Sequence, residues 1–406
     1  MKPNAMAMYS TLNAGQKRVF DAAIEWWHSN KRYPFEISGP PGAGKTYLIN
    51  CIIDALEIDR ERVAPLAYTG AAAINMRNHG MFNAKTGHSW LYQPVEMVVR
   101  DENGRVVMDP VFNKPKVRIE YVERAVIPGI DLFVVDEAGS VPPSMRRTIE
   151  KFGIPVIAAG DLDQLPPIHD HPAYLNNPAN VHILDEIMRQ NMNSGIIYLS
   201  QRAKAGLPIH CGWYNDALVI YEDQLTDDMM LKSNIVICSR NTTRDEFTHY
   251  FREKLFGFNT PLPLFRERVV CRQNNWQIET DDGINLTNGL LGNVCNDPMN
   301  TYDRKTGMFK LDFKPDMSIG MFPQLNCSAK YFTASSEARK LLKQDRYCIG
   351  EKFEFGYAIT THMSQGSEYN NGIYFEEFLN PNINHKLNYV GVSRFKQFCI
   401  YVRKRY

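Results

Sequence analysis

The chain has 406 residues, of which 44% are hydrophobic and 22% charged, proportions typical of a globular protein with two to four domains. A formal net charge of +1 excludes a protein-wide electrostatic field that would attract polyanions, so any nucleic-acid contacts must come from local patches. No apolar run approaches a membrane span, and the N-terminus MKPNAMAMYS lacks the apolar core of a signal peptide. Eight cysteines without a C-x-x-C pair predict reduced thiols and no zinc site, so we expect a cytoplasmic protein without membrane attachment.

The first half of the chain alternates helical and strand-like segments. LNAGQKRVFDAAIEWWHSN has helical spacing with Asn13 as its N-cap, and a second helix is expected from Lys45 to about Leu56. Strands that alternate with helices predict a parallel, doubly wound sheet, which binds ligands at the carboxyl ends of its strands. Its predicted buried strands are YPFEISG, VAPLAYTG, DLFVVDEAG and IPVIAAGD.

The segment from Val95 to Asp109 interrupts this alternation. Two β-rich arms flank Asn103-Gly104, a dipeptide that strongly indicates a hairpin turn. We expect a hairpin that stands out from the sheet, and a simple surface flap is the alternative.

A second α/β region begins near Leu184. LKSNIVICSRN predicts a buried strand, and the same pattern resumes in FEFGYAITTHMSQGSE and HKLNYVGVSRFKQFCIYV. Between about Cys271 and Gly350, short β-like pieces and turns predict a small inserted β-barrel. The expected fold is therefore α/β, with two parallel-sheet cores that each carry a β insertion.

The segment GPPGAGKT fits the pattern G-x-x-x-x-G-K-[ST] in full and lies between a predicted strand and a predicted helix. In such a loop, backbone N–H groups and the helix N-terminus surround phosphate oxygens. We expect Lys45 to reach the β- and γ-phosphates of ATP and the Thr46 hydroxyl to bind Mg²⁺. The whole loop is expected to bind nucleotide: Gly39, Pro40, Pro41, Gly42, Ala43, Gly44, Lys45 and Thr46.

Polar residues follow two further predicted strands. LFVVDEAG supplies Asp136 as a Mg²⁺ ligand and Glu137 to polarise the attacking water, with an acidic helix N-terminus as the alternative. AAGDLDQLPPI supplies Gln164, which can contact the γ-phosphate and sense its loss, with a solvent-facing turn residue as the alternative. Together with the phosphate loop, these residues predict ATP hydrolysis.

The motifs resemble those of superfamily 1 helicases, and most closely the RecD/Dda-like subgroup that moves 5′ to 3′ on DNA. GDLDQLPPI is similar to motif III of these enzymes, and the likeness extends from Asn13 to Tyr401. The chain departs from the family at Met363, where a lysine is usual, and at Ala67–Gly70, where Ala-Pro-Thr-Gly is usual. The other similar segments are LNAGQKRVF, YTGAAAINM, TGHSW, IMRQNMNSGIIYLSQRAKAG, YAITTHMSQGSEY and NYVGVSRFKQF.

This resemblance implies further site residues. Gln16 would read adenine, and Gly366 and Glu368 would contact the nucleotide side of the cleft. Arg189 and Arg394 would stabilise transition-state charge, although each alone reads as an ordinary surface arginine. The residues expected to contact a DNA strand are Thr69, Gly70, Ala71, Thr86, His88, Trp90, His362 and Ser364, with a core position as the alternative for Trp90.

The resemblance also implies two RecA-like P-loop cores, with a strand-separating pin hairpin inserted in the first and an SH3-like barrel in the second. The implied bounds are 1–90 and 125–186 for the ATP-binding first core, 91–124 for the pin, 187–271 and 351–406 for the second core, and 272–350 for the barrel.

The resulting prediction is a monomeric, Mg²⁺-dependent ATP hydrolase that moves 5′ to 3′ on single-stranded DNA and unwinds forked duplex in replication, repair or recombination. A single-strand-binding protein and replication proteins are candidate partners. Two alternatives stay open: a DNA-stimulated translocase that removes bound proteins or remodels junctions, and an accessory ATPase switch without strand separation. The compact chain is similar to phage-encoded family members, which would act in the host cytoplasm.

Overall fold

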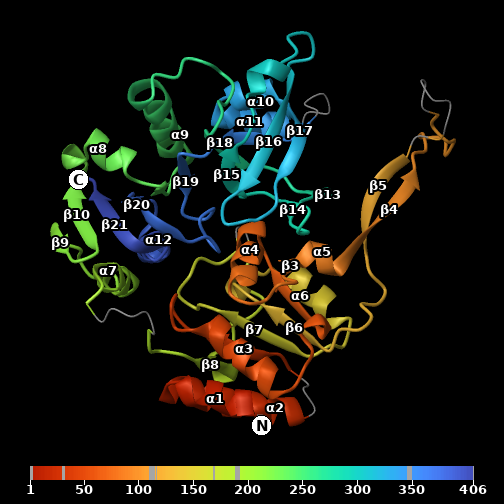
Figure 1. The fold of residues 1–406 in the computed structure, drawn as a ribbon, viewed down its shortest axis with the longest axis vertical. Coiled ribbons are helices and arrows are strands. Elements are labelled where there is room, and N and C mark those ends of the chain that lie inside the picture. The colour runs from red at the N-terminus through yellow and green to blue at the C-terminus, as the bar shows by residue number, and fades with distance from the viewer. Residues whose placement is uncertain are drawn as a thin grey trace.

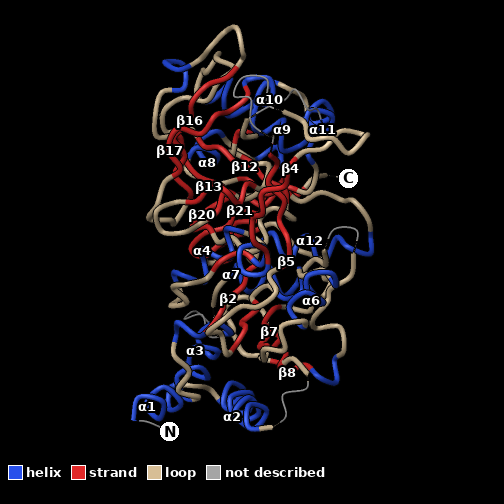
Figure 2. Tube along the Cα trace, turned by 90° about the vertical axis from the view of Figure 1, so that its right-hand side faces the viewer, coloured by secondary structure: helices blue, strands red, loops and turns tan. Residues whose placement is uncertain are grey.

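The computed structural model describes residues 3–29, 33–108, 115, 117–167, 170–187, 193–344 and 350–405. Two α/β cores lie beside each other, with helices α1 (Pro3–Thr11) and α2 (Ala14–His28) at one end of the molecule (Figure 1). An antiparallel sheet caps the opposite end, as the view from the side also shows (Figure 2). The predicted α/β class with two sheet-based cores is therefore confirmed.

The first core contains a six-stranded sheet in the order β3-β2-β6-β7-β1-β8, and every pair in it is parallel. Because helices cover both faces, the central strands are apolar along their whole length and fully buried. The strands are β1 (Phe35–Ser38), β2 (Val63–Ala67), β3 (Lys85–Thr86), β6 (Leu132–Val135), β7 (Val156–Gly160) and β8 (Val181–Ile183). The helices are α3 (Lys45–Ala55), α4 (Gly70–Asn78), α5 (Gly87–Leu91) and α6 (Pro143–Glu150).

The second core contains a six-stranded sheet in the order β19-β11-β20-β21-β10-β9, in which only β9 is antiparallel to its neighbour. Helices α7 and α12 pack together on one face. The strands are β9 (Gly212–Tyr214), β10 (Ala217–Tyr221), β11 (Val236–Cys238), β19 (Ala358–Thr360), β20 (Tyr369–Phe375) and β21 (Phe395–Arg403). The helices are α7 (Gly195–Lys204), α8 (Asp227–Leu231), α9 (Asn241–His249) and α12 (Pro381–Val392).

The β insertion of the second core is a five-stranded antiparallel sheet in the order β17-β16-β15-β12-β18. It extends from Arg268 to Phe355 and so is wider than the predicted 272–350, because its first and last strands pair with each other before the chain returns to the core. Its elements are β12 (Arg268–Cys271), β15 (Leu291–Val294), β16 (Met308–Pro315), β17 (Phe322–Ser328), β18 (Phe353–Phe355), the ribbon β13 (Asn275–Glu279) and β14 (Asn285–Leu286), and helices α10 (Ala329–Thr333) and α11 (Ser336–Gln344).

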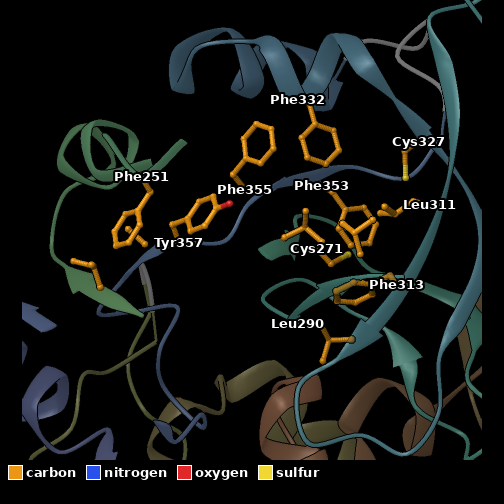
Figure 3. Close-up of a cluster of buried hydrophobic side chains, with 14 of the residues drawn as sticks. Phe251, Cys271, Leu290, Leu311, Phe313, Cys327, Phe332, Phe353, Phe355 and Tyr357 are labelled. Atoms are coloured by element: carbon orange, nitrogen blue, oxygen red, sulfur yellow. The ribbon is translucent and has the colours of Figure 1, made fainter. Parts of the chain in front are cut away.

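This insertion and the second core share one hydrophobic core. The cluster combines Phe313 and Phe353 of the insertion with Val236 and Ile373 of the second core sheet. The aromatic rings run without a break from Phe332 to Phe251 across the boundary (Figure 3). Since apolar side chains packed at this density resist sliding, the insertion and the second core form one mechanical unit.

The predicted hairpin is present, but its arms differ from the prediction. Strand β4 (Tyr92–Val98) pairs with β5 (Val117–Glu123) and not with residues 105–108, so the predicted hairpin Val95 to Asp109 is wrong in its second arm as far as the structure describes it. The Asn103-Gly104 turn forms only the tip of the hairpin, where Arg100 and Val106 pair in an isolated antiparallel β-bridge. A turn motif determines the pairing only of the residues next to it. The partner of β4 is β5, farther along the chain, and the two strands form a ribbon that projects from the body of the molecule (Figure 1).

The shared core predicts a large effect of Phe313→Ala, since this side chain is fully buried. We expect a loss of about 3–5 kcal/mol in the free energy of unfolding, as for other Phe→Ala changes in cores. Denaturant unfolding should report it, and Phe82→Ala, at a position 78% exposed, is the matched control with a change under about 0.5 kcal/mol. Equal midpoints for the two variants would contradict the shared core.

Candidate active site

The phosphate loop connects β1 to α3 in a strand–loop–helix arrangement. Gly44 caps α3 with φ 77°, a left-handed conformation that favours glycine. A Cβ on Gly39 would lie 2.7 Å from the carbonyl oxygen of Leu184, so only glycine allows this close approach of the loop to the end of β8. These two glycines therefore determine the path of the loop, in which the backbone N–H groups can surround a phosphate group.

The Lys45 ammonium is held by the loop itself. Its Nζ donates to the carbonyl oxygens of Gly39 at 2.6 Å and Pro40 at 3.1 Å. The cation therefore already lies across the mouth of the loop, and a phosphate would exchange with these carbonyl partners.

A cavity of about 380 Å³ opens in front of the loop, between the two cores. Most of the predicted catalytic and nucleotide-binding side chains line it, although they come from distant parts of the chain. These are Lys45, Thr46, Asp136, Glu137, Gln164, Gly366, Glu368 and Arg394. Predicted Arg189 lies outside the described residues.

Asp136 and Glu137 follow the buried strand β6. Burial raises the pKa of both carboxyls, while Lys45 opposes this rise at Asp136 and Arg394 opposes it at Glu137. Glu137 has φ 49°, and its N–H donates to Asp136 Oδ1 at 2.9 Å. This left-handed backbone turns Glu137 toward Arg394, whose Nη1 lies 3.8 Å from Glu137 Oε1. A carboxyl with a raised pKa beside a cation suits proton transfer to or from water.

The residues around the cavity fit a divalent cation. The Thr46 hydroxyl and the Asp136 carboxylate are hard oxygen donors, and both line the same space next to Lys45. Mg²⁺ prefers one or two such protein ligands together with phosphate oxygens. Thr46 and Asp136 therefore remain the expected Mg²⁺ ligands.

Gln164 and Arg394 are both buried and reach the cavity from opposite cores. The Gln164 N–H donates to the carbonyl oxygen of Asp161 at 3.3 Å, which closes a turn after β7. Arg394 follows α12 and donates from Nε to the carbonyl oxygen of Val390 at 3.2 Å. The arrangement supplies a neutral amide and a guanidinium to the same phosphate position.

Gln16 is buried at the base of the loop. Its Oε1 accepts from Asn13 N at 3.1 Å, and Asn13 Oδ1 accepts from Gln16 N at 2.7 Å, so the predicted N-cap is confirmed. Its Nε2 donates to the carbonyl oxygen of Ala43 at 3.1 Å. Gln16 thus ties α2 to the phosphate loop, and its contact with adenine stays a prediction.

Sequence reasoning missed four cavity-lining residues. Asn75 and His79 lie one helical turn apart on the α4 side of the cavity. Their i,i+4 spacing places them on one face of the helix, and this spacing is the signal that could have identified them. Tyr47 follows the loop directly, and Lys396 forms an ion pair with Glu368. Tyr47 lies just outside the phosphate-loop pattern, and Lys396 lies within NYVGVSRFKQF two residues after Arg394.

Several residues predicted to contact DNA meet where the first core, the hairpin and the insertion join. The His88 ring stacks between Tyr92 of β4 at 5.3 Å and Trp276 of β13 at 4.6 Å. Thr69 caps α4 and Thr86 caps α5. Burial lowers the pKa of both His88 and His362, so these rings are neutral at pH 7 and suit stacking better than ion pairing.

The structure corrects the predicted strand contact of Ser364 and places Trp90 at the edge of the first core. Ser364 is fully buried and its hydroxyl donates to the carbonyl oxygen of Thr361 at 2.8 Å, so it is not accessible to DNA. The Trp90 ring packs on the core of the first sheet, and its Nε1 donates to the carbonyl oxygen of Pro65 at 2.9 Å. Because Trp90 is only partly buried, its contact with DNA stays a prediction, with the core position as the alternative.

The fold and this site define a P-loop nucleotide-binding protein with two RecA-like cores. The AAA domain family profile matches residues 11–224, more than half of the chain, and the chain belongs to that family. Of the described residues, no helix combines the length and apolar character needed to cross a bilayer.

Curated relatives match over short stretches. The chain is 29% identical over 164 residues to the "ATP-dependent DNA helicase PIF7" of Trypanosoma brucei brucei, covering 39% of this chain and 15% of the relative. It is 31% identical over 144 residues to the "ATP-dependent DNA helicase Pif1" of a Psychrobacter species, covering 32% of this chain and 19% of the relative. The matches thus span less than a fifth of the length of either relative.

Solved structures resemble the chain over nearly its whole length. Bacteroides Pif1 bound to single-stranded DNA is 15% identical, with a TM-score of 0.51 over 96% of this chain and 92% of that one. A structure of two coordinating Pif1 helicases at forked double-stranded DNA is 17% identical, with a TM-score of 0.52 over the same shares. At this identity the likeness establishes the fold.

Replacement of Lys45 by alanine should abolish ATP turnover, with a loss of at least about 100-fold, because the expected γ-phosphate cation is removed. Strand binding should persist, since the predicted DNA contacts lie elsewhere. Lys232→Ala, at an exposed lysine of an i,i+4 ion pair, is the control and should keep full turnover. Phosphate release and strand-binding assays measure the two properties, and turnover retained by Lys45→Ala would exclude this site.

Proposed function

We propose that the chain is an ATP-dependent DNA helicase that moves 5′ to 3′ along single-stranded DNA and unwinds forked duplex. The observation that carries the proposal is the shared cavity, where Lys45 and Glu137 of the first core face Arg394 of the second. A site completed by two units couples nucleotide state to their relative position, which is what a motor requires.

In the proposed reaction, Lys45 exchanges its loop carbonyls for the β- and γ-phosphates of ATP. Glu137 polarises a water whose oxygen attacks the γ-phosphorus in line with the leaving oxygen of ADP. Arg394 stabilises the charge that develops on the γ-phosphoryl oxygens, an effect of about 10³- to 10⁵-fold in rate for such arginines. Thr46 and Asp136 would hold Mg²⁺, which would supply positive charge to the phosphate groups.

The proposed strand path crosses the N-termini of α4 and α5. Hydroxyl and N–H donors there, on Thr69, Gly70 and Ala71, suit phosphate oxygens and need no net positive charge. The predicted contact of Thr86 is left out of this path, because Thr86 is buried and its hydroxyl is bonded to Ser89. The neutral ring of His362, which follows β19, suits base stacking, a contact worth about 1–3 kcal/mol per base. Stacking of this kind is independent of sequence, as a motor on DNA requires.

Contacts between the cores support coupling of the strand path to the cavity. A Cβ on Gly366 of the second core would lie 2.8 Å from the Ala72 Cβ on α4, so the nucleotide cleft and the strand-binding helix touch directly. Bacteroides Pif1 bound to single-stranded DNA shares this fold, which supports DNA as the substrate. The polarity rests on the resemblance to RecD/Dda-like enzymes, with β4 and β5 as the proposed strand-separating pin and residues 272–350 as its support.

Duplexes with a 5′ or a 3′ single-stranded tail, compared side by side, test the proposal. We expect strand separation of the 5′-tailed substrate only, with ATP and Mg²⁺ present. Separation of the 3′-tailed substrate alone would overturn the polarity. DNA-stimulated ATP hydrolysis without strand separation would leave a translocase, and ATP hydrolysis without any DNA stimulation would favour an accessory switch.

Loss of the Gln164 amide should uncouple hydrolysis from unwinding, because this side chain is the proposed γ-phosphate sensor. For Gln164→Ala we expect nucleotide affinity within about twofold of the unsubstituted chain and unwinding reduced by about tenfold or more. The control Asn370→Ala removes an exposed amide on β20 and should leave both unchanged. Unwinding by Gln164→Ala at the full rate would exclude the sensor role.

A further inference from the structure

The turn after β7 is held by the second core at successive positions. Asp161, which begins this turn, accepts a hydrogen bond at Oδ2 from the Tyr389 hydroxyl on α12, at 2.5 Å. Three further contacts follow along the turn: Lys204 with Asp163 at 2.5 Å, Lys386 Nζ with the Gln164 carbonyl at 3.5 Å, and Gln365 Nε2 with the Leu165 carbonyl at 3.0 Å.

Of these contacts, the Tyr389–Asp161 hydrogen bond is the only one between two buried side chains. Tyr389 is 2% exposed and Asp161 is 4% exposed, whereas the Lys204 and Asp163 side chains are 43% and 40% exposed. Exposed ion pairs contribute little to stability, while a buried polar group that loses its partner carries the full desolvation cost. Burial also raises the pKa of Tyr389, so its hydroxyl stays protonated and can donate.

Asp161 determines where Gln164 lies. Its Oδ1 accepts from Asp163 N at 2.9 Å, and its carbonyl oxygen accepts from Gln164 N at 3.3 Å. The N–H of Leu162 donates to Ser38 Oγ at 3.2 Å, which anchors the turn to the end of β1. The two oxygens of one carboxylate thus join the turn that carries Gln164 to the helix that carries Tyr389.

Tyr389 in turn lies one helical turn before Arg394. The N–H of Ser393 donates to the Tyr389 carbonyl at 3.1 Å, and Arg394 Nε donates to the Val390 carbonyl at 3.2 Å. The end of α12 therefore determines where Arg394 lies, and Tyr389 joins this end of the helix to the first core.

We propose that Tyr389 is a positioning residue for phosphoryl transfer: its hydrogen bond to Asp161 fixes Gln164 and Arg394 relative to each other across the cleft. Tyr389 does not line the cavity and acts through these two residues. The proposal rests on the proposed function of the cavity. Since a displacement of about 1 Å can reduce a rate by about 10²-fold, loss of this one bond should affect turnover more than nucleotide binding.

The Tyr389→Phe substitution keeps the ring and removes only the hydroxyl. We expect kcat for DNA-stimulated ATP hydrolysis to fall about tenfold or more, with the Kd for a fluorescent ATP analogue within about twofold. The control is Tyr374→Phe, which removes a fully buried hydroxyl that donates to Asn388 Oδ1 at 2.8 Å on the same helix but within the second core. Its kcat should stay within about twofold of the unsubstituted chain.

A double-mutant cycle separates positioning from a general loss of stability. Asp161→Ala removes the carboxylate that accepts from Tyr389, together with the acceptor for Asp163 N. If the two residues act through one bond, the double variant should have about the kcat of Asp161→Ala alone. If the double variant instead shows the product of the two single-variant reductions in kcat, the proposal is overturned. Should Tyr389→Phe melt far below the unsubstituted chain, a kcat of Asp161→Ala equal to that of the unsubstituted chain would overturn it as well, because this variant leaves Tyr389 without its acceptor.

The outcomes also separate this inference from the proposed function. An unsubstituted chain without ATP hydrolysis, with or without DNA, would overturn the proposed function itself. Normal hydrolysis in the unsubstituted chain, together with normal kcat in Tyr389→Phe, would overturn only the positioning role.

Discussion

The alignment of strand ends at the carboxyl edge of the first sheet is the constraint on which the site depends. In the parallel register, Ser38 of β1 pairs with Gly160 of β7, and Val135 of β6 pairs with Ala158 of the same strand. The phosphate loop, the acidic pair and the turn after β7 therefore begin on three neighbouring strands at the same edge of the sheet. These three segments supply a phosphate cradle, two carboxyls and an amide, but the cation that completes the set comes from the second core.

The parts that follow this edge could be predicted from sequence because each is encoded locally. A loop between a strand and a helix, or two acids after an apolar strand, is visible in a window of ten residues. Burial is a tertiary property, and so the sequence pattern predicts a DNA contact for Ser364 on a surface that the fold does not leave open to it. The second arm of the hairpin was missed because a strong turn signal outweighed a partner strand farther along the chain. The Tyr389–Asp161 bond joins residues 228 positions apart, and neither residue type marks the pairing.

The shared hydrophobic core determines which parts move together. The insertion packs into the second core through a continuous apolar cluster, which on the first core includes Ile74 of α4; its other contacts with the first core include polar and aromatic ones, such as Ser89 with Asn285 and His88 with Trp276. Apolar packing resists rearrangement, while hydrogen bonds and ring stacks can exchange partners at lower cost. Relative motion of the cores therefore concentrates at the nucleotide cleft and at the junction of hairpin and insertion, the two places that a coupled motor would use.

The hydrogen bonds of Lys45 to its own loop have a thermodynamic consequence for nucleotide binding. An ammonium already bonded to the Gly39 and Pro40 carbonyls gives up those bonds when a phosphate arrives, so part of the gained enthalpy is cancelled. The same bonds hold the side chain in one rotamer beforehand, which reduces the entropy lost on binding. These bonds thereby keep the loop in a shape that can receive a phosphate, and Lys45 favours ligands whose oxygens replace both carbonyl oxygens.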